Sequence, residues 1–186
     1  MQSENSSKHT KSKHRNGVSK EMHQLIHGLV YSTSPEQAVE DAKENVFYPL
    51  LEQDVFNYFE TLENRNRWKD VPPVACASKP DGEELIETGW ASTVSEYQHG
   101  FKQVEEFLEN HELHELWNDR EVYEDYQRGF QKIGEVQGRA TFLYDPEAQG
   151  IRTKQHLDHV QETWEEYQPQ DFENQNLYVV PADVHY

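Results

Sequence analysis

The sequence predicts an α+β domain in which about five helices pack on a small, mostly antiparallel sheet. Two observations support this prediction. Apolar residues recur at helical spacing in several segments, and short runs rich in aromatic and β-branched residues stand between them without a regular strand–helix–strand order. Ten Tyr, eight Phe and four Trp compensate for an apolar share of only 34%, because each aromatic side chain can bury a large area.

The 186 residues divide into a tail and one domain. Residues 1–20 are rich in Ser, Lys and His and carry almost no apolar side chain. Burial cannot offset their ordering entropy, so we expect a disordered basic tail. Residues 21–186 then form a single acidic α+β domain, the usual organisation for a chain of this length.

Two helices are predicted before residue 53. Apolar residues from Met22 to Val30 follow the i, i+3, i+4 pattern and predict a first short helix. The segment 34–37 (SPEQ) offers a Ser N-cap, a Pro in the first turn and a Gln three residues after the cap. It predicts a second helix that continues to about residue 52, unless Pro49 ends it earlier.

The middle of the chain predicts two short strands and one long helix. Residues 55–62 (VFNYFETL) are aromatic and partly alternating, and residues 73–78 (PVACAS) lie between a proline pair and a turn sequence. Residues 83–110 place apolar side chains at steps of three and four, which predicts a single amphipathic helix. Gly89 and Gly100 lie inside it, and such glycines often permit the close approach of another backbone.

The last third predicts a further mixture of helix and strand. In chain order, the predicted elements are a short helical turn within residues 111–119, a helix over 122–136, a strand over 138–145, a tight turn ending at Gly150, a helix from Thr153 to Pro169, and a strand over 177–180 that Pro181 closes. These elements complete the α+β pattern.

The charge is large and unevenly placed. Lys and Arg total 17 against 35 Asp and Glu, a net charge of -18, yet residues 1–20 carry +4 from five basic residues and one acid. Three interpretations remain open: adaptation to a salty cytoplasm, as in a halophile; an acidic face for a basic partner, including mimicry of nucleic acid; and an ordinary acidic protein. The excess of acidic residues favours adaptation to salt. The predominance of Lys over Arg, ten against seven, does not favour it.

Several classes of protein are excluded or disfavoured. No apolar run approaches the roughly 20 residues of a membrane span, and the first 20 residues lack the apolar stretch of a secretory signal. Cys76 is the only cysteine, so no intramolecular disulfide forms and a reducing, cytoplasmic location is expected. Because an acidic domain repels phosphate, we expect no direct binding of nucleic acid by the folded domain.

The ten histidines are the only feature of the sequence that points to a cofactor, which would be a divalent metal ion. His111 and His114 are spaced i,i+3 in the segment HELHEL, His156 and His159 share the same spacing, and His23 and His27 are spaced i,i+4. HELHEL is not the HExxH motif of zinc peptidases. The four candidate metal ligands are His111, His114, His156 and His159.

No catalytic motif supports an enzyme. The sequence contains neither a GxSxG nucleophile elbow nor a phosphate-binding GxxxxGK or GxGxxG loop. The leading hypothesis is therefore a soluble, non-catalytic interaction or accessory protein whose partner is another protein and whose oligomeric state is open. The alternatives are a small metal-dependent enzyme with histidines from separate helices, and an acidic mimic of nucleic acid that inhibits a basic partner.

Overall fold

Two ten-residue strands pair along their whole length at the centre of the sheet. They are β1 (His23–Ser32) and β5 (Asn176–His185), which run antiparallel from His23 opposite His185 to Ser32 opposite Asn176. The computed structural model describes residues 23–64, 67–112, 114–124, 126–127, 141–166 and 175–185. The expected disordered tail and most of the helix expected over residues 122–136 lie outside these ranges.

Three short strands extend the central pair into a mixed, five-stranded sheet of order β2-β5-β1-β4. β2 (Tyr58–Thr61) and β3 (Ala75–Cys76) both pair antiparallel with β5, at different places along it. β4 (Leu143–Tyr144) pairs parallel with β1. The expected α+β class and the mostly antiparallel sheet are thus confirmed.

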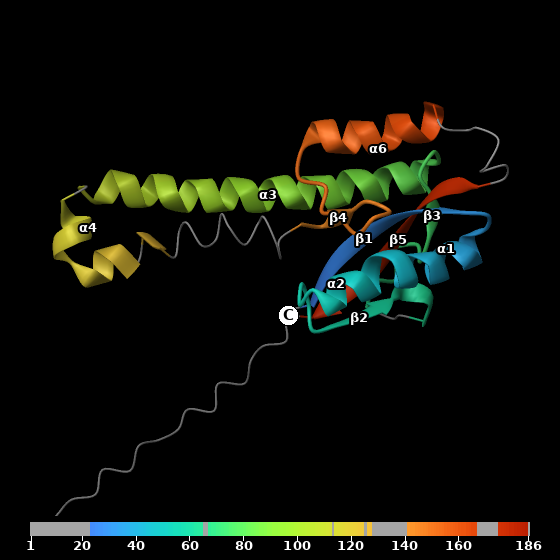
Figure 1. Cartoon of the computed structure of the whole chain (residues 1–186), viewed down its shortest axis with the longest axis horizontal. Coiled ribbons are helices and arrows are strands. Elements are labelled where there is room, and N and C mark those ends of the chain that lie inside the picture. Colours follow the sequence, from blue (N-terminus) through green and yellow to red (C-terminus); the bar gives the residue numbers. More distant parts are fainter. Residues whose placement is uncertain are drawn as a thin grey trace, which may run out of the picture.

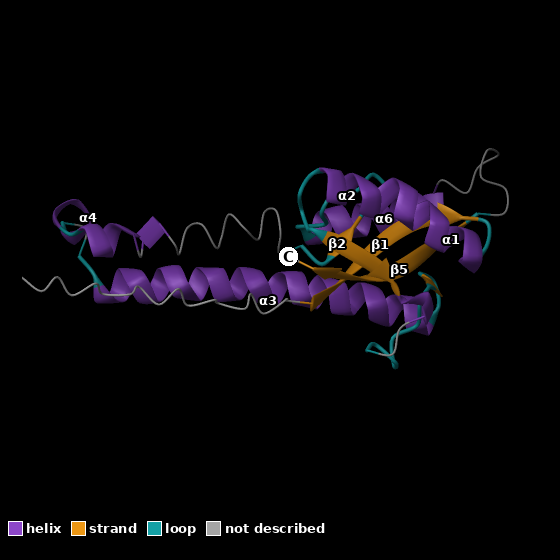
Figure 2. Cartoon of the chain, turned by 90° about the horizontal axis from the view of Figure 1, so that it is seen from below, coloured by secondary structure: helices purple, strands orange, loops and turns teal. Residues whose placement is uncertain are grey.

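Helices cover both faces of the sheet. One continuous helical segment, made of α1 (Pro35–Ala42), η1 (Lys43–Phe47) and α2 (Tyr48–Glu52), lies on one face. α3 (Pro80–Asn110) and α6 (Lys154–Glu166) lie on the other, and α3 continues well past the sheet to the short helix α4 (Glu115–Asn118) (Figures 1 and 2). Four separate helices thus have their bounds in the described residues, where about five were expected. None of the described helices is long and apolar enough to cross a bilayer.

The prediction of a helix from Met22 to Val30 is wrong, because residues 23–30 belong to strand β1. Ile26 and Val30 pack into the core beneath α1–α2, while Leu29 packs into the core beneath α3 and α6. A strand buried on both faces reads as a continuous apolar run rather than as an alternation. Such a run also satisfies the i, i+3, i+4 pattern, so the spacing alone could not separate the two structures.

The prediction that Pro181 closes the last strand is also wrong, since β5 continues to His185. Pro181 lies opposite His27, whose backbone N–H donates to the Phe142 carbonyl on the β4 side instead of to β5. In an antiparallel ladder, the nitrogen of Pro181 then faces the other edge of β5. On that edge, β3 pairs with β5 only as far as Val179 of β5, and the pairing of β2 starts at Ala182 of β5. Pro181 lies between these two positions, so no neighbouring strand needs its missing N–H.

Most other predicted elements are confirmed with shifted bounds. The Ser34 hydroxyl accepts a hydrogen bond from the Gln37 N–H at 3.2 Å, as the N-cap prediction requires. The helix passes through Pro49 because the π-helical turn η1 comes directly before it and adjusts the backbone hydrogen bonding. The Thr153 hydroxyl likewise accepts from the His156 N–H at the start of α6.

A tight junction joins β1, β4 and the first half of α3. The Nδ1 atom of His27 lies 3.1 Å from the Phe142 carbonyl oxygen, and a β-carbon added at Gly89 would lie 2.9 Å from that Nδ1 and 3.2 Å from the same oxygen. The Thr93 hydroxyl donates to the Gly89 carbonyl and accepts from the Phe142 N–H, both at 3.0 Å. The expected close approach of another backbone is therefore confirmed for Gly89.

Gly89→Ala is expected to destabilise the fold by about 1–3 kcal/mol, because the added methyl group forces α3 away from His27. In a helix without this contact, the same change stabilises by about 1 kcal/mol, so the sign of the effect is diagnostic. Chemical denaturation measures it. The matched control is Glu87→Ala at an exposed position of the same helix, expected to stay within about 0.5 kcal/mol of wild type. A stabilised Gly89→Ala protein would contradict the described junction.

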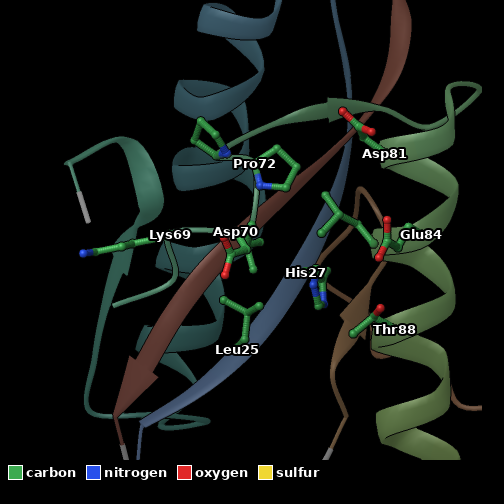
Figure 3. A pocket seen from close by; sticks show the side chains of 11 residues that line it. Leu25, His27, Lys69, Asp70, Pro72, Asp81, Glu84 and Thr88 are labelled. Carbon is green, nitrogen blue, oxygen red and sulfur yellow. The ribbon is translucent and has the colours of Figure 1, made fainter. Parts of the chain in front are cut away.

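The imidazole of His27, which Figure 3 shows on β1, is buried, and its burial makes stability depend on pH. Burial lowers the pKa of His27 from 6.5 to about 4, so the side chain is neutral in the folded protein near pH 7. As pH falls below about 6.5, the unfolded chain takes up a proton that the folded chain accepts only near pH 4. Stability is therefore lost across that window, by up to about 3 kcal/mol.

Replacing His27 with Gln is expected to remove this part of the pH dependence between pH 7 and pH 4, as measured by urea denaturation at each pH. The exposed His159 provides the control, because His159→Gln leaves the buried group in place. Identical pH profiles for wild type and His27→Gln would show that His27 titrates normally in the folded state.

Candidate functional site

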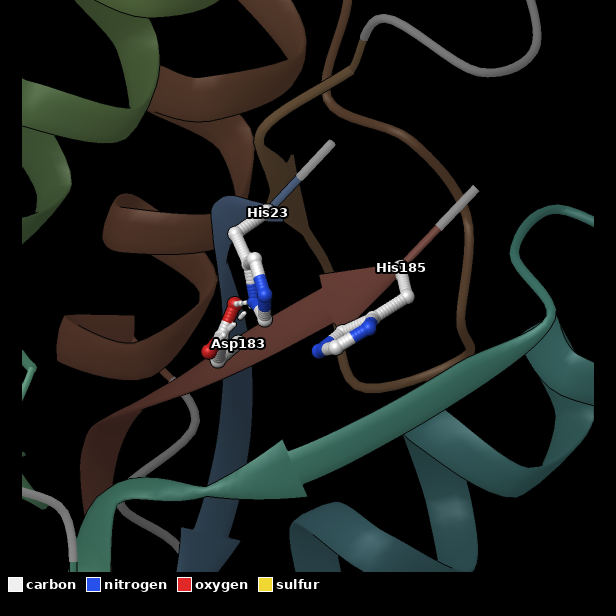
Figure 4. Close-up of side chains that lie close together, drawn as sticks. All are labelled: His23, Asp183 and His185. Atoms are coloured by element: carbon white, nitrogen blue, oxygen red, sulfur yellow. Dashed lines mark hydrogen bonds and ion pairs between the residues drawn. The ribbon is translucent and has the colours of Figure 1, made fainter. Parts of the chain in front are cut away.

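Two histidines and an aspartate meet where the central strand pair ends (Figure 4). His23 begins β1 and lies directly opposite His185, and Asp183 precedes His185 by two residues, so all three side chains lie on the α3 side of the sheet. The His23 Nδ1 atom lies 3.1 Å from both Asp183 carboxylate oxygens. The rings of His23 and His185 are edge to face with centroids 3.8 Å apart.

The members of this group differ in burial. The Asp183 side chain is fully buried, whereas His23 and His185 are half-buried. A buried carboxylate requires compensation by charge or hydrogen bonds. His23 supplies one such partner and the half-exposed guanidinium of Arg67, 3.9 Å from Asp183, supplies another.

Strand β2 adds two polar side chains beside the group. Tyr58 pairs with His185 and Glu60 pairs with Asp183 in the antiparallel register, which places both on the same sheet face. The Tyr58 hydroxyl donates to Glu60 at 3.3 Å, and the Tyr58 ring stands edge to face with His185 at 5.4 Å between centroids. Three strands therefore contribute side chains to one polar patch.

The spacing suits a small metal ion. One potential ligand atom from each of His23, Asp183 and His185 lies within 4.8 Å of the other two. Zinc bonds of about 2.0–2.2 Å place two ligand atoms of a tetrahedral site roughly 3.3–3.6 Å apart. The 3.1 Å between His23 Nδ1 and Asp183 is close to that separation, and ligand atoms of the set that lie up to 4.8 Å apart would have to move closer together.

A pocket of about 430 Å³ lies further along the same sheet face. Leu25 and His27 of β1, the loop of residues 69–73 and the first turns of α3 form its walls (Figure 3). Leu25 is the register partner of Asp183, so the pocket begins beside the His–Asp group. The pocket adjoins the apolar core beneath α3 and α6, since Leu85 and Val71 belong to both.

The four histidines predicted from the sequence as metal ligands lie elsewhere. His111 and His114 each lie beside a glutamate, at 3.4 Å from Glu115 and 3.2 Å from Glu112. In the part of the chain that the structure describes, neither joins a set of three possible ligands. Their role as ligands stays a prediction.

The two histidines on α6, His156 and His159, have different hydrogen-bond partners. His156 Nε2 lies 2.9 Å from the buried carboxylate of Asp145, which also accepts hydrogen bonds from the backbone of its own turn. His159 instead shares a hydrogen bond with Thr163 one helical turn further on. The structure thus gives each histidine its own partner and does not join the two in a three-ligand group among the described residues.

Sequence reasoning missed Asp183 and His185 because it ended the strand at Pro181. The signal was present in the alternation of Asp183 and His185, which puts two potential ligands on one face of a strand. The i,i+4 spacing of His23 and His27 predicts that both lie on one face of a helix, whereas the structure places them on strand β1. The pairing of His23 with the other end of the chain is a property of the β1–β5 register.

Comparison with known proteins identifies a family and no function. No curated protein and no solved structure shows significant similarity to the chain. A family described as a domain of unknown function, DUF7995, matches residues 22–186, a range that includes the whole sheet and all three members of the His–Asp group. Since this match covers most of the sequence, the chain belongs to the DUF7995 family.

Proposed function

We propose that the protein binds one divalent transition-metal ion, of the zinc type, through His23, Asp183 and His185. The observation that supports this proposal is the convergence of two imidazoles and a buried carboxylate within 4.8 Å at the end of the central strand pair. Imidazole nitrogen and carboxylate oxygen are preferred zinc ligands. The histidines come from strands rather than from the separate helices of the earlier alternative.

The number of ligands suggests what the ion would do. Structural zinc sites use four protein ligands, whereas catalytic sites use three and keep a water molecule in the fourth position. Such a water has a pKa near 7 and supplies hydroxide at neutral pH. A three-ligand site that adjoins a pocket therefore supports a metal-dependent activity on a small molecule.

A plain ion pair between His23 and Asp183 is the competing explanation. It accounts for the 3.1 Å contact, but it assigns nothing to His185. The Nε2 atom of His185 is buried and has no hydrogen-bond partner among the described residues, and such a group is costly. A metal ion would use both histidines at once.

Isothermal titration of chelator-treated protein with Zn²⁺ is expected to give one equivalent of tight binding, and Co²⁺ is expected to give the visible spectrum of a tetrahedral site. His185→Ala and Asp183→Asn should each weaken Zn²⁺ binding by about 100-fold, since each removes one of three ligands. Circular dichroism checks the folding of both variants.

His159→Ala is the matched control, because it removes an exposed histidine outside the group and should leave the affinity unchanged. Where Asp183→Asn fails to fold, the half-buried His185 at the strand end still provides a folded test. Wild-type affinity in the His185→Ala variant would refute the proposed site, as would the absence of a stoichiometric Zn²⁺ equivalent.

Binding of another protein through the projecting part of α3 is our second proposed function. Phe101 and Leu108 are each 60% exposed on the part of α3 that extends past the sheet. Large exposed apolar side chains on a projecting helix are suited to a partner surface. The nucleic-acid-mimic alternative has only the net charge of -18 in its favour.

Lys102 lies beside Phe101 and is well exposed, so an amine-reactive cross-linker can report on this contact. We expect the wild-type chain to form cross-links from Lys102 in a lysate of its source cells, and the double variant Phe101→Ser, Leu108→Ser to lose them while keeping its melting temperature. An absence of cross-links from Lys102, or their persistence in the double variant, would argue against α3 as an interface.

A further inference from the structure

The pocket beside the metal-binding group contains an unused hydrogen-bond acceptor. The Phe142 carbonyl can only accept, so the 3.1 Å contact places the proton of the neutral His27 imidazole on Nδ1. The Nε2 atom then carries a lone pair. It is buried, and no described residue donates a hydrogen bond to it.

Three acidic side chains line the same pocket as this acceptor. Asp70 from the loop, and Asp81 and Glu84 from α3, line the pocket together with one cation, Lys69 (Figure 3). Carboxylates in the first turns of a helix also stabilise the helix itself, so they would not by themselves indicate a ligand. Together with the buried Nε2 atom of His27, which has no hydrogen-bond partner among the described residues, they form a cavity that favours a positive charge and a hydrogen-bond donor.

The remaining walls are apolar. Leu25, Val71, Leu85 and two prolines, Pro72 and Pro73, line the pocket between the charged groups. A short aliphatic chain would cover this surface while its charged end reaches the carboxylates. A metal ion fits less well, because His27 does not join any set of three possible metal ligands in the described ranges.

We propose that this pocket binds a small organic cation, a primary amine or guanidinium on a short aliphatic chain, whose N–H group donates to His27 Nε2 and whose charge is balanced by Asp70 and Glu84. The site is distinct from the proposed metal-binding group and can be tested without metal. It would place the ligand on the same sheet face, with Leu25 between the two sites.

Agmatine is a suitable probe, because it carries a guanidinium and an ammonium on a four-carbon chain. Titration of metal-free, full-length protein should be followed by nitrogen-15 NMR of the histidine side chains, at the lowest KCl concentration that keeps the protein folded. We expect a saturable shift of the His27 Nε2 resonance, whereas butyrate, the anionic control of similar length, should cause none.

The Asp70→Asn, Glu84→Gln double variant should weaken agmatine binding by at least roughly tenfold, since it removes two charges from the pocket wall. Glu87→Gln, on the same helix but outside the pocket lining, should bind as wild type does. His27→Leu should abolish binding, and the resonance shift in wild-type protein tests the same contact if this variant does not fold.

Three results would overturn the proposal: no shift of His27 Nε2 at saturating agmatine, an equal response to butyrate, or unchanged affinity in the double variant. Because the protein is metal-free throughout, these outcomes do not depend on zinc binding. A protein that binds Zn²⁺ and ignores agmatine would refute this proposal alone, and the reverse result would refute only the metal site.

Discussion

The pairing of β1 with β5 is the interaction on which the rest of the molecule depends. All ten residues of each strand are in register, and the other three strands attach to one or other of the two. Helices bury both faces, so the backbone of the pair is shielded from water and its hydrogen bonds are made within the sheet. The polar group of His23, Asp183 and His185 forms because β1 begins where β5 ends, with His23 opposite His185.

The helices were easier to predict than the strands. The first half of the long helix α3 packs on the sheet through Leu85 and Ile86 and has its opposite face in water, and this contrast is visible as a three-and-four spacing of apolar residues. β1 has no such contrast, because Ile26 and Leu29 enter opposite cores. Pro181 misled the prediction of β5, since only the sheet order reveals that its nitrogen faces a gap between β2 and β3.

The candidate site was less predictable than the fold. Residue spacing can suggest only ligands that share one element, such as the predicted pair His156 and His159, and it cannot detect ligands joined by pairing between distant strands. His23 and Asp183 are 160 residues apart in sequence and 3.1 Å apart in space. The unpartnered nitrogen of His27 was equally hidden, because its environment comes from β4, α3 and a loop.

The central pair also bears on the order of events during synthesis. Its partners are separated by 162 residues at one end, from 23 to 185, and by 144 at the other, from 32 to 176. Contacts of such high sequence separation require the closure of a long loop before they contribute any free energy, which slows folding. While β5 is still inside the ribosome, β1, β2 and β3 lack the strand with which all three pair antiparallel. Helix α3 and the α1–α2 segment can form early, but β5 covers its share of their apolar faces only after residue 185 has emerged, an interval in which protection from aggregation matters most.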